Sequence, residues 1–163
     1  MEKIGSIRLG NSVMVSDPSY GVATWLNKEI DGVLSGDYNV YVTISNEGAW
    51  GERVKSLTVC HSEYKPNKTL RGMEKACYHI GVDSGTCGIY DIDYFKSHHN
   101  EQTANDDWYI RTVMNGFYEK REQSYITDGI GVHSCTGFGD GLYIAYVKRN
   151  KDGQIIQITI KYI

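Results

Sequence analysis

The sequence predicts an α+β protein of mostly antiparallel β-sheet, arranged as a sandwich or a partly closed barrel, with one main α-helix near residues 106–118. The chain has 13 tyrosines and 18 glycines but only two prolines, and tyrosine favours strands whereas glycine favours turns. Short runs of alternating apolar and polar residues recur along the chain, and one segment instead has helical spacing. At 163 residues we expect a single domain, 1–163.

The first third of the chain predicts short elements separated by turns. Residues 6–8 and 12–15 flank Gly10-Asn11 and favour an opening hairpin. Asp17-Pro18-Ser19-Tyr20 stops the second run, because the aspartate can bind backbone N–H groups and proline presets a turn. Residues 24–30 are interpreted as a brief helix capped by Thr24, with Trp25 pointing inward.

The middle and last thirds predict longer strands. Strands are expected at residues 37–45, 53–61, 77–82, 86–90, 142–148 and 155–162. Residues 150–153 favour a hairpin turn before the last strand. In that strand the isoleucines alternate with Gln157, Thr159 and Lys161, so the isoleucines should face the core and the polar residues the solvent.

The helical and loop segments are predicted from spacing and composition. Asp106 or Asp107 could cap the main helix, in which Tyr109, Val113 and Phe117 recur at every fourth position. Residues 91–95 resemble a short helical turn. Residues 62–75 are polar and basic and predict an exposed loop. Residues 98–105 predict a second polar loop, with His98-His99 solvated.

Charge and cysteine content exclude some classes of function. The net charge of −3 argues against general nucleic-acid binding, which needs a basic face. No apolar run is long enough to predict a membrane span, and the N-terminus does not resemble a signal peptide. The four cysteines have no CxxC spacing, so free thiols and a cytoplasmic location are expected.

Residues 134–143, Ser-Cys-Thr-Gly-Phe-Gly-Asp-Gly-Leu-Tyr, are the strongest candidate for a binding surface. Glycine permits sharp turns that point several N–H groups one way, so these groups with Ser134 and Thr136 could cradle an anion or a phosphate. The alternative interpretation is structural, with Gly139-Asp140-Gly141 as a bulged hairpin. Both interpretations remain open from the sequence.

Three aspartates, Asp17, Asp83 and Asp140, stand at strand ends beside small or hydroxyl residues. They could gather to hold a cation or a ligand, but the favoured interpretation is that each binds its own turn. His133 could form an acid–base pair with Asp140, although strand alternation argues against it. Cys135 is interpreted as a buried thiol in preference to a nucleophile.

The aromatic residues favour binding. Trp50-Gly51-Glu52-Arg53 combines a ring, a flexible turn and a cation. Aromatic side chains in a cleft stack on planar rings, and Arg53 or Arg71 could meet phosphates. The alternative is that Trp25, Trp50 and Trp108 are all core residues.

The Asp-Pro-Ser-Tyr, Asp-Ser-Gly and Gly-Phe-Gly-Asp-Gly motifs, in this order and spacing, resemble a family of bacterial and phage proteins classified only as a domain of unknown function. The chain differs at Tyr143-Ile144-Ala145, where Tyr-Pro-Val is expected after the glycine loop. The resemblance implies a fold and a prokaryotic or viral origin, and it implies no reaction.

These observations, with the resemblance, favour a non-enzymatic binding protein in the cytoplasm of a bacterial host cell, for a small phosphorylated or nucleotide-like ligand. One role of this kind is that of a phage sponge that sequesters a host immune signal. The alternatives are a protein-interaction module of immunity or inhibitor type, for which a homo-oligomer is possible, and a metal-dependent hydrolase. No catalytic residue, metal ligand or cofactor is assigned. The residues assigned to ligand binding are Trp50, Arg53, Asp83, Ser84, Ser134, Thr136, Gly137, Gly139, Asp140 and Tyr143.

Overall fold

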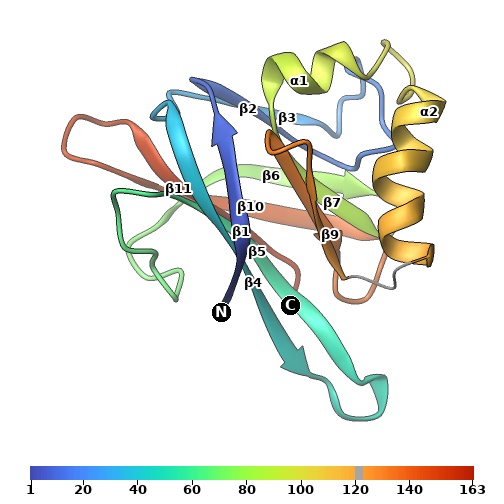
Figure 1. The fold of residues 1–163 in the computed structure, drawn as a ribbon. Coiled ribbons are helices and arrows are strands. Elements are labelled where there is room, and N and C mark those ends of the chain that lie inside the picture. The colour runs from blue at the N-terminus through green and yellow to red at the C-terminus, as the bar shows by residue number, and fades with distance from the viewer. Residues whose placement is uncertain (120–122) are drawn as a thin grey trace.

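Over residues 1–119 and 123–163, which the computed structural model describes, the chain folds into two antiparallel β-sheets packed face to face (Figure 1). The helices cover the outer face of one sheet. The predicted α+β class with mostly antiparallel sheet is confirmed, and because neither sheet closes on itself the structure is a sandwich.

The larger sheet contains most of the strands that the sequence predicts. Its inward face is apolar, as in Val40, Val59 and Ile158, and its outward face carries residues such as Thr58 and Thr159. In spatial order its strands are β1 (Glu2–Leu9), β4 (Gly36–Asn46), β5 (Glu52–His61), β11 (Ile155–Lys161), β10 (Gly141–Arg149) and β6 (Glu74–Val82).

The smaller sheet closes the other side of the core. Val13, Ile89 and Val132 on its inward face pack against the larger sheet. Its strands are, in order, β3 (Lys28–Asp31), β2 (Ser12–Ser16), β7 (Thr86–Asp91), β9 (Gly131–Cys135) and β8 (Ser124–Thr127). The chain passes from one sheet to the other between β6 and β7 and between β9 and β10, so the loops after β6 and β9 meet at one end of the sandwich.

Two predictions for the first third of the chain are wrong. Instead of forming a hairpin with β2, β1 pairs with β4, because the chain changes sheet at Gly10, whose N–H is bound by Asp91 at 2.8 Å. Instead of a helix, residues 28–31 form β3. Pairing with Val13 and burial of the Ile30 side chain in the core stabilise a strand here more than a local helix would. Trp25 is 75% exposed and does not point inward.

The helical layer packs on the smaller sheet. It consists of α1 (Ile92–Ser97), α2 (Asp106–Tyr109) and the wider helical segment η2 (Ile110–Glu119). Trp108 and Val113 join Phe95 and Tyr90 in a second apolar cluster beneath it. The N-cap of α2 is Asn105 and not Asp106 or Asp107, and its side chain accepts a hydrogen bond from the Trp108 N–H. The side chain of Phe117, predicted on the same face, lies outside the described residues.

Two loops have more contacts than the sequence predicts. The basic loop is confirmed over residues 62–73, but β6 already includes Lys75. This loop covers Gln157, which is fully buried although the strand pattern predicts it in solvent. In the second loop His99 is buried, and its ring nitrogens face the carbonyl oxygens of Phe95 and Pro18 at 2.7 and 3.0 Å.

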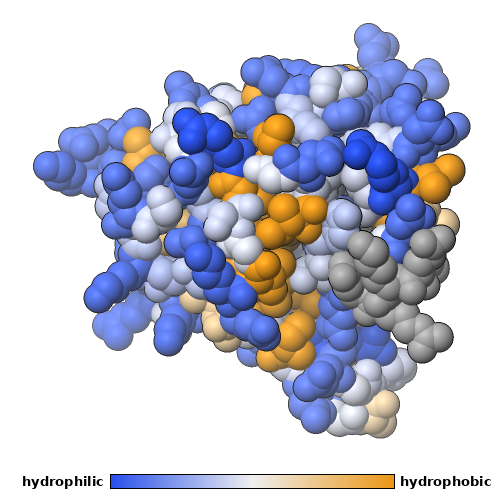
Figure 2. Space-filling view, in the orientation of Figure 1, coloured by the Kyte–Doolittle hydropathy of each residue, from blue (hydrophilic) through white to orange (hydrophobic). Residues whose placement is uncertain are grey.

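An apolar strip marks the side where the edges of the two sheets meet. Figure 2 shows it in the middle of this face, alongside β1 and surrounded by hydrophilic residues. Ile4 of β1 and Ile126 of β8, the edge strands of the two sheets, are partly buried against the main core. A Cβ atom on Gly5 would overlap Ile126 Cδ1, so a larger residue at this position would require the Ile126 side chain to move.

Candidate functional site

A buried aspartate joins two of the sequence motifs at one end of the sandwich. Asp17 follows β2 and is 0% exposed. Its Oδ2 accepts hydrogen bonds from the N–H groups of Asp83 (2.9 Å) and Ser84 (2.8 Å), and its Oδ1 accepts from the Ser84 hydroxyl and from the N–H and hydroxyl of Ser19. Five donors of the described chain therefore surround this carboxylate, which compensates for its burial.

The other two aspartates lie near the same turn but bind different donors. Asp83 Oδ2 accepts a hydrogen bond of 2.6 Å from the Tyr20 hydroxyl. Burial is the main cause that raises the pKa of this hydroxyl, and the hydrogen bond to Asp83 raises it further. Asp140 Oδ1 accepts from the N–H of Gly85 at 2.9 Å. Within the described part of the chain, no group of three or more His, Cys, Asp or Glu side chains is placed to hold a metal ion.

The glycine loop is held in shape by its own polar groups. The Thr136 hydroxyl donates to the carbonyl oxygen of Gly139, and the Thr136 N–H donates to the carbonyl oxygen of Gly85 at 3.0 Å. The hydroxyl of Tyr143 lies within hydrogen-bonding distance of the carbonyl oxygens of Thr136 (2.9 Å) and Gly139. Apart from the bond to Gly85 in the β6–β7 turn, these bonds lie within residues 134–143, and they hold a turn with Phe138 at its tip.

The strand that enters the loop points its side chains in opposite directions. Ser134 is buried between the sheets, where its hydroxyl donates to the Tyr162 hydroxyl at 3.1 Å. His133 lies on the other face, and burial lowers its pKa to about 3. Cys135 is half-buried, and burial raises the pKa of its thiol. All four cysteines are free, as predicted.

Trp50, Arg53 and Phe138 line an open hollow of about 410 Å³. Trp50 ends the short helix η1 (Gly48–Trp50) at the tip of the β4–β5 hairpin, which extends beyond the sandwich in Figure 1. The rings of Trp50 and Phe138 meet edge to face with centroids 6.3 Å apart, and the two residues are 67% and 58% exposed. Large apolar rings at this exposure are available to a ligand.

Arg53 has polar atoms that the described chain does not satisfy. Its Nε is buried and has no hydrogen-bond partner among the described residues, and the same holds for the hydroxyl of Ser45, its cross-strand neighbour. Arg53 takes part in none of the ion pairs formed by residues 1–119 and 123–163. Buried polar groups normally have hydrogen-bond partners. An anionic group of a ligand would therefore form its strongest hydrogen bonds in this hollow with the Arg53 guanidinium.

The residues assigned to ligand binding from the sequence lie in three places. Trp50 and Arg53 line the hollow, whereas Ser134 points into the core and away from it. The remaining assigned residues are not among the described lining residues of the hollow: Asp83 and Ser84 lie in the turn bound by Asp17, and Thr136, Gly137, Gly139, Asp140 and Tyr143 lie in the glycine loop that carries Phe138.

Phe138 and Ser45 were not assigned as site residues from the sequence. The signal for Phe138 is its place as a large apolar residue between two glycines, Gly137 and Gly139, which both have positive φ angles (65° and 105°). A Cβ atom on Gly137 would lie 3.1 Å from the carbonyl oxygen of Val54. Glycine therefore lets the loop lie directly on β5, next to Arg53.

The other aromatic and basic candidates lie elsewhere. Trp25 is exposed but is not among the three lining residues, and Trp108 is buried in the helical layer. Arg71 belongs to the loop over the larger sheet and does not line this hollow. The prediction that a tryptophan and an arginine lie together therefore applies to Trp50 and Arg53.

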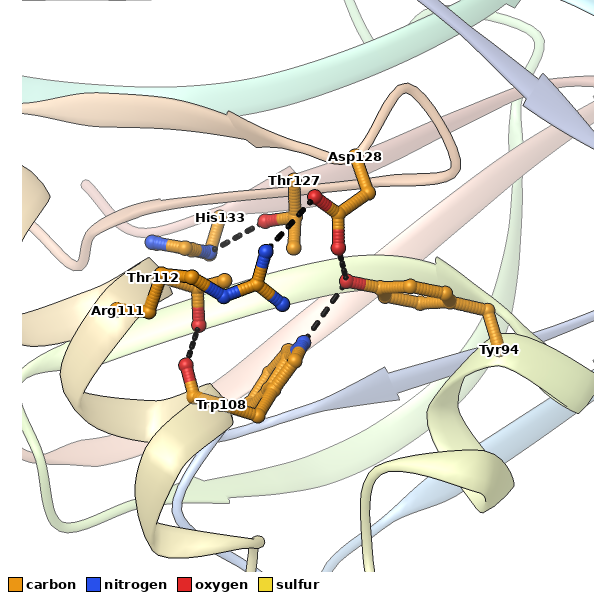
Figure 3. A network of polar contacts seen from close by, with 7 residues as sticks. All are labelled: Tyr94, Trp108, Arg111, Thr112, Thr127, Asp128 and His133. Atoms are coloured by element: carbon orange, nitrogen blue, oxygen red, sulfur yellow. Dashed lines mark hydrogen bonds and ion pairs between the residues drawn. The ribbon is translucent and has the colours of Figure 1, made fainter.

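A separate polar network joins the helical layer to the smaller sheet (Figure 3). The Tyr94 hydroxyl accepts from the Trp108 indole N–H at 2.8 Å and donates to Asp128 at 2.6 Å, and Arg111 Nη1 lies 3.4 Å from the other Asp128 oxygen. These groups satisfy one another, so the network stabilises the packing of the helices.

The fold and the hollow define a two-sheet β-sandwich protein with an aromatic-arginine surface at one end. A family model described as a protein of unknown function (DUF4241) matches residues 11–160, and the chain belongs to this family. Comparison with curated proteins and with solved structures gives no match. No helix in the described ranges is long and apolar enough to cross a membrane.

Proposed function

We propose that the chain binds a small phosphorylated or nucleotide-like ligand in the hollow between Trp50, Arg53 and Phe138. The observation that carries this proposal is the placement of Arg53, which has a buried Nε without a partner in the described chain, beside two exposed rings. A phosphate group supplies the acceptors that Arg53 lacks, and a planar base supplies a surface for the rings.

The energetics of the two contacts favour a ligand that has both groups. Stacking of a base on an aromatic side chain contributes about 1–3 kcal/mol, and a charge-assisted hydrogen bond contributes roughly 1.5–3 kcal/mol. A ligand that has only the ring or only the phosphate loses one of these contributions. A nucleotide should therefore bind more tightly than its nucleoside or than inorganic phosphate.

We further propose that the protein sequesters the ligand without converting it. This role is the one expected of a phage-encoded sponge for a signalling nucleotide in a bacterial cell, and it is supported by the resemblance to bacterial and phage proteins. A ligand that is only sequestered is released from the protein in its original chemical form. A ligand that is converted is released as a product.

Calorimetric titration with AMP, ATP, cyclic dinucleotides, adenosine and inorganic phosphate tests both proposals. We expect at least one nucleotide to bind and to be recovered intact after heat release, with adenosine and phosphate weaker. Quenching of tryptophan fluorescence gives a local signal, which Trp50→Phe should remove and Trp25→Phe, at a similarly exposed position, should retain. The absence of binding to every nucleotide, or quenching that depends on Trp25, would contradict the proposed site, and a hydrolysed ligand would contradict sequestration.

A further inference from the structure

A second hollow, of about 270 Å³, lies on the outer face of the larger sheet beside the basic loop of residues 62–73. Its floor comes from β5 and β11, and one wall comes from Asn67, Lys68, Thr69 and Leu70 of the loop. It shares no lining residue with the hollow at Trp50. A ligand in this hollow would therefore contact a different set of described residues from a ligand at the proposed nucleotide site.

The wall of this second hollow is fixed to the sheet. The buried Gln157 side chain accepts a hydrogen bond from the Asn67 N–H at 2.7 Å and donates to the Asn67 carbonyl oxygen at 3.1 Å. Lys148 donates to the Asn67 side chain at 3.1 Å. Because β10 and β11 both hold Asn67, the hollow is formed before any ligand arrives, which reduces the entropy cost of binding.

The floor contains a hydroxyl hydrogen that has no acceptor in the described chain. Thr58 and Thr159 are a cross-strand pair, only 2% and 5% exposed, with hydroxyl oxygens 3.0 Å apart. Gln157 Nε2 donates to the Thr159 hydroxyl oxygen at 3.2 Å. The two hydroxyls have two hydrogens but share one hydrogen bond. Whichever threonine donates to the other, one hydrogen remains for a ligand.

The rim of the hollow is rich in lysine. Lys55, Lys161 and Lys68 line it from β5, β11 and the loop, Met1 and Ile163 also line it, and no aspartate or glutamate of the described residues does so. None of the ion pairs among the described residues uses these lysines. Three cations from different directions above a hydroxyl donor suit an anion that has several acceptor oxygens and more than one negative charge.

We propose that this second hollow binds a tetrahedral oxyanion of the phosphate class. The floor hydroxyl donates to one oxygen, and the ammonium groups of Lys55, Lys68 and Lys161 bind the others. The same chemistry can come from free phosphate or from the phosphoryl group of a larger molecule, and the open mouth of the hollow admits both.

Calorimetric titration with inorganic phosphate, at ionic strength matched with chloride, tests this site directly. Loss of one charge-assisted contact in Lys161→Gln should weaken phosphate binding roughly tenfold. Lys151→Gln makes the same change of charge in the distant β10–β11 turn and should leave binding unchanged. No binding to the wild-type protein, or equal weakening by both substitutions, would overturn the proposal.

The threonine pair supplies a second test. Thr58→Val and Thr159→Val each leave one hydroxyl hydrogen, so each single variant should still bind phosphate. The double variant removes the donor and should bind roughly tenfold more weakly. If the double variant binds phosphate as tightly as the wild type, the threonine hydroxyls do not donate to the oxyanion. The single variants provide the folding control.

Titration with glycerol phosphate and with glycerol identifies the source of the oxyanion. If glycerol phosphate binds at least as tightly as inorganic phosphate and depends on Lys161, the site accepts phosphoryl groups of larger molecules. If only inorganic phosphate binds, the ligand is the free anion. Arg53→Gln should leave phosphate binding in this hollow intact. A wrong proposal for the phosphate site can therefore be distinguished from a wrong proposal for the nucleotide site.

Discussion

Ser84 donates two hydrogen bonds to the buried carboxylate of Asp17, one from its backbone N–H and one from its hydroxyl, both 2.8 Å long. This contact joins the end of β2 to the loop between β6 and β7, and therefore connects the two sheets at the end where the glycine loop lies. Two motifs 67 residues apart thus form one structural unit.

Replacing Asp17 with asparagine should destabilise the fold strongly. The asparagine amide places an N–H₂ group among donors that now point at a carboxylate, so buried N–H and O–H groups lose their acceptor. We expect the free energy of unfolding to fall by roughly 3–5 kcal/mol, measured by urea denaturation. Asp83→Asn is the control, because the exposed Asp83 side chain accepts a hydrogen bond from the Tyr20 hydroxyl and from no other described residue. It should cost about 1 kcal/mol, and equal costs for the two variants would contradict this account.

The buried imidazole of His133 predicts a loss of stability in acid. Burial lowers its pKa from 6.5 to about 3, so between these values the unfolded chain binds a proton that the folded chain does not. The stability contributed by the neutral ring is complete above pH 6.5 and declines as the pH falls toward 3. We expect this group to remove about 2 kcal/mol from the free energy of unfolding between pH 7 and pH 5.

The change of stability with pH, and not its absolute value, isolates this effect. Urea denaturation at pH 7, 6 and 5 should show a smaller decline in His133→Gln than in the wild-type protein, whatever the variant costs at pH 7. The same decline in both proteins would show that other groups cause the acid sensitivity.

Gly137 and Gly139 should respond differently to alanine. Both have positive φ, so each substitution strains the backbone by about 1–2 kcal/mol. At Gly139 the new Cβ has open space, whereas at Gly137 it lies 2.9 Å from Ile163 Cγ1 and 3.1 Å from the Val54 carbonyl oxygen. Thermal denaturation should therefore show a larger loss for Gly137→Ala. A larger loss for Gly139→Ala would show that the loop does not lie on β5 as described.

The strands were predictable where their residues alternate clearly. The 37–45 and 53–61 patterns correspond to β4 and β5 because one face of each is buried in the core. Residues 28–31 were not predictable, since their strand depends on pairing with Val13 and Val15, which no local pattern specifies. The sheet change at Gly10 likewise depends on Asp91, far along the chain.

The candidate site was only partly predictable for a similar reason. Trp50 and Arg53 could be selected because a ring and a cation stand close together in the sequence. Ser134 was assigned to the site because it borders the glycine loop, but strand alternation turns its side chain into the core. The position of Phe138 beside Trp50 depends on two distant loops meeting, and single-sequence patterns do not contain that information.

Binding of nucleotide to Arg53→Gln and Arg71→Gln tests the central claim most directly. Each variant removes one arginine charge, but only Arg53 lines the hollow with Trp50 and Phe138. For the nucleotide that binds the wild-type protein most tightly, calorimetry should show Arg53→Gln weaker by about 10- to 100-fold, with Arg71→Gln unchanged and both variants as thermally stable as the wild type. Unchanged binding in Arg53→Gln, or equal weakening in the two variants, would contradict a ligand site at this hollow.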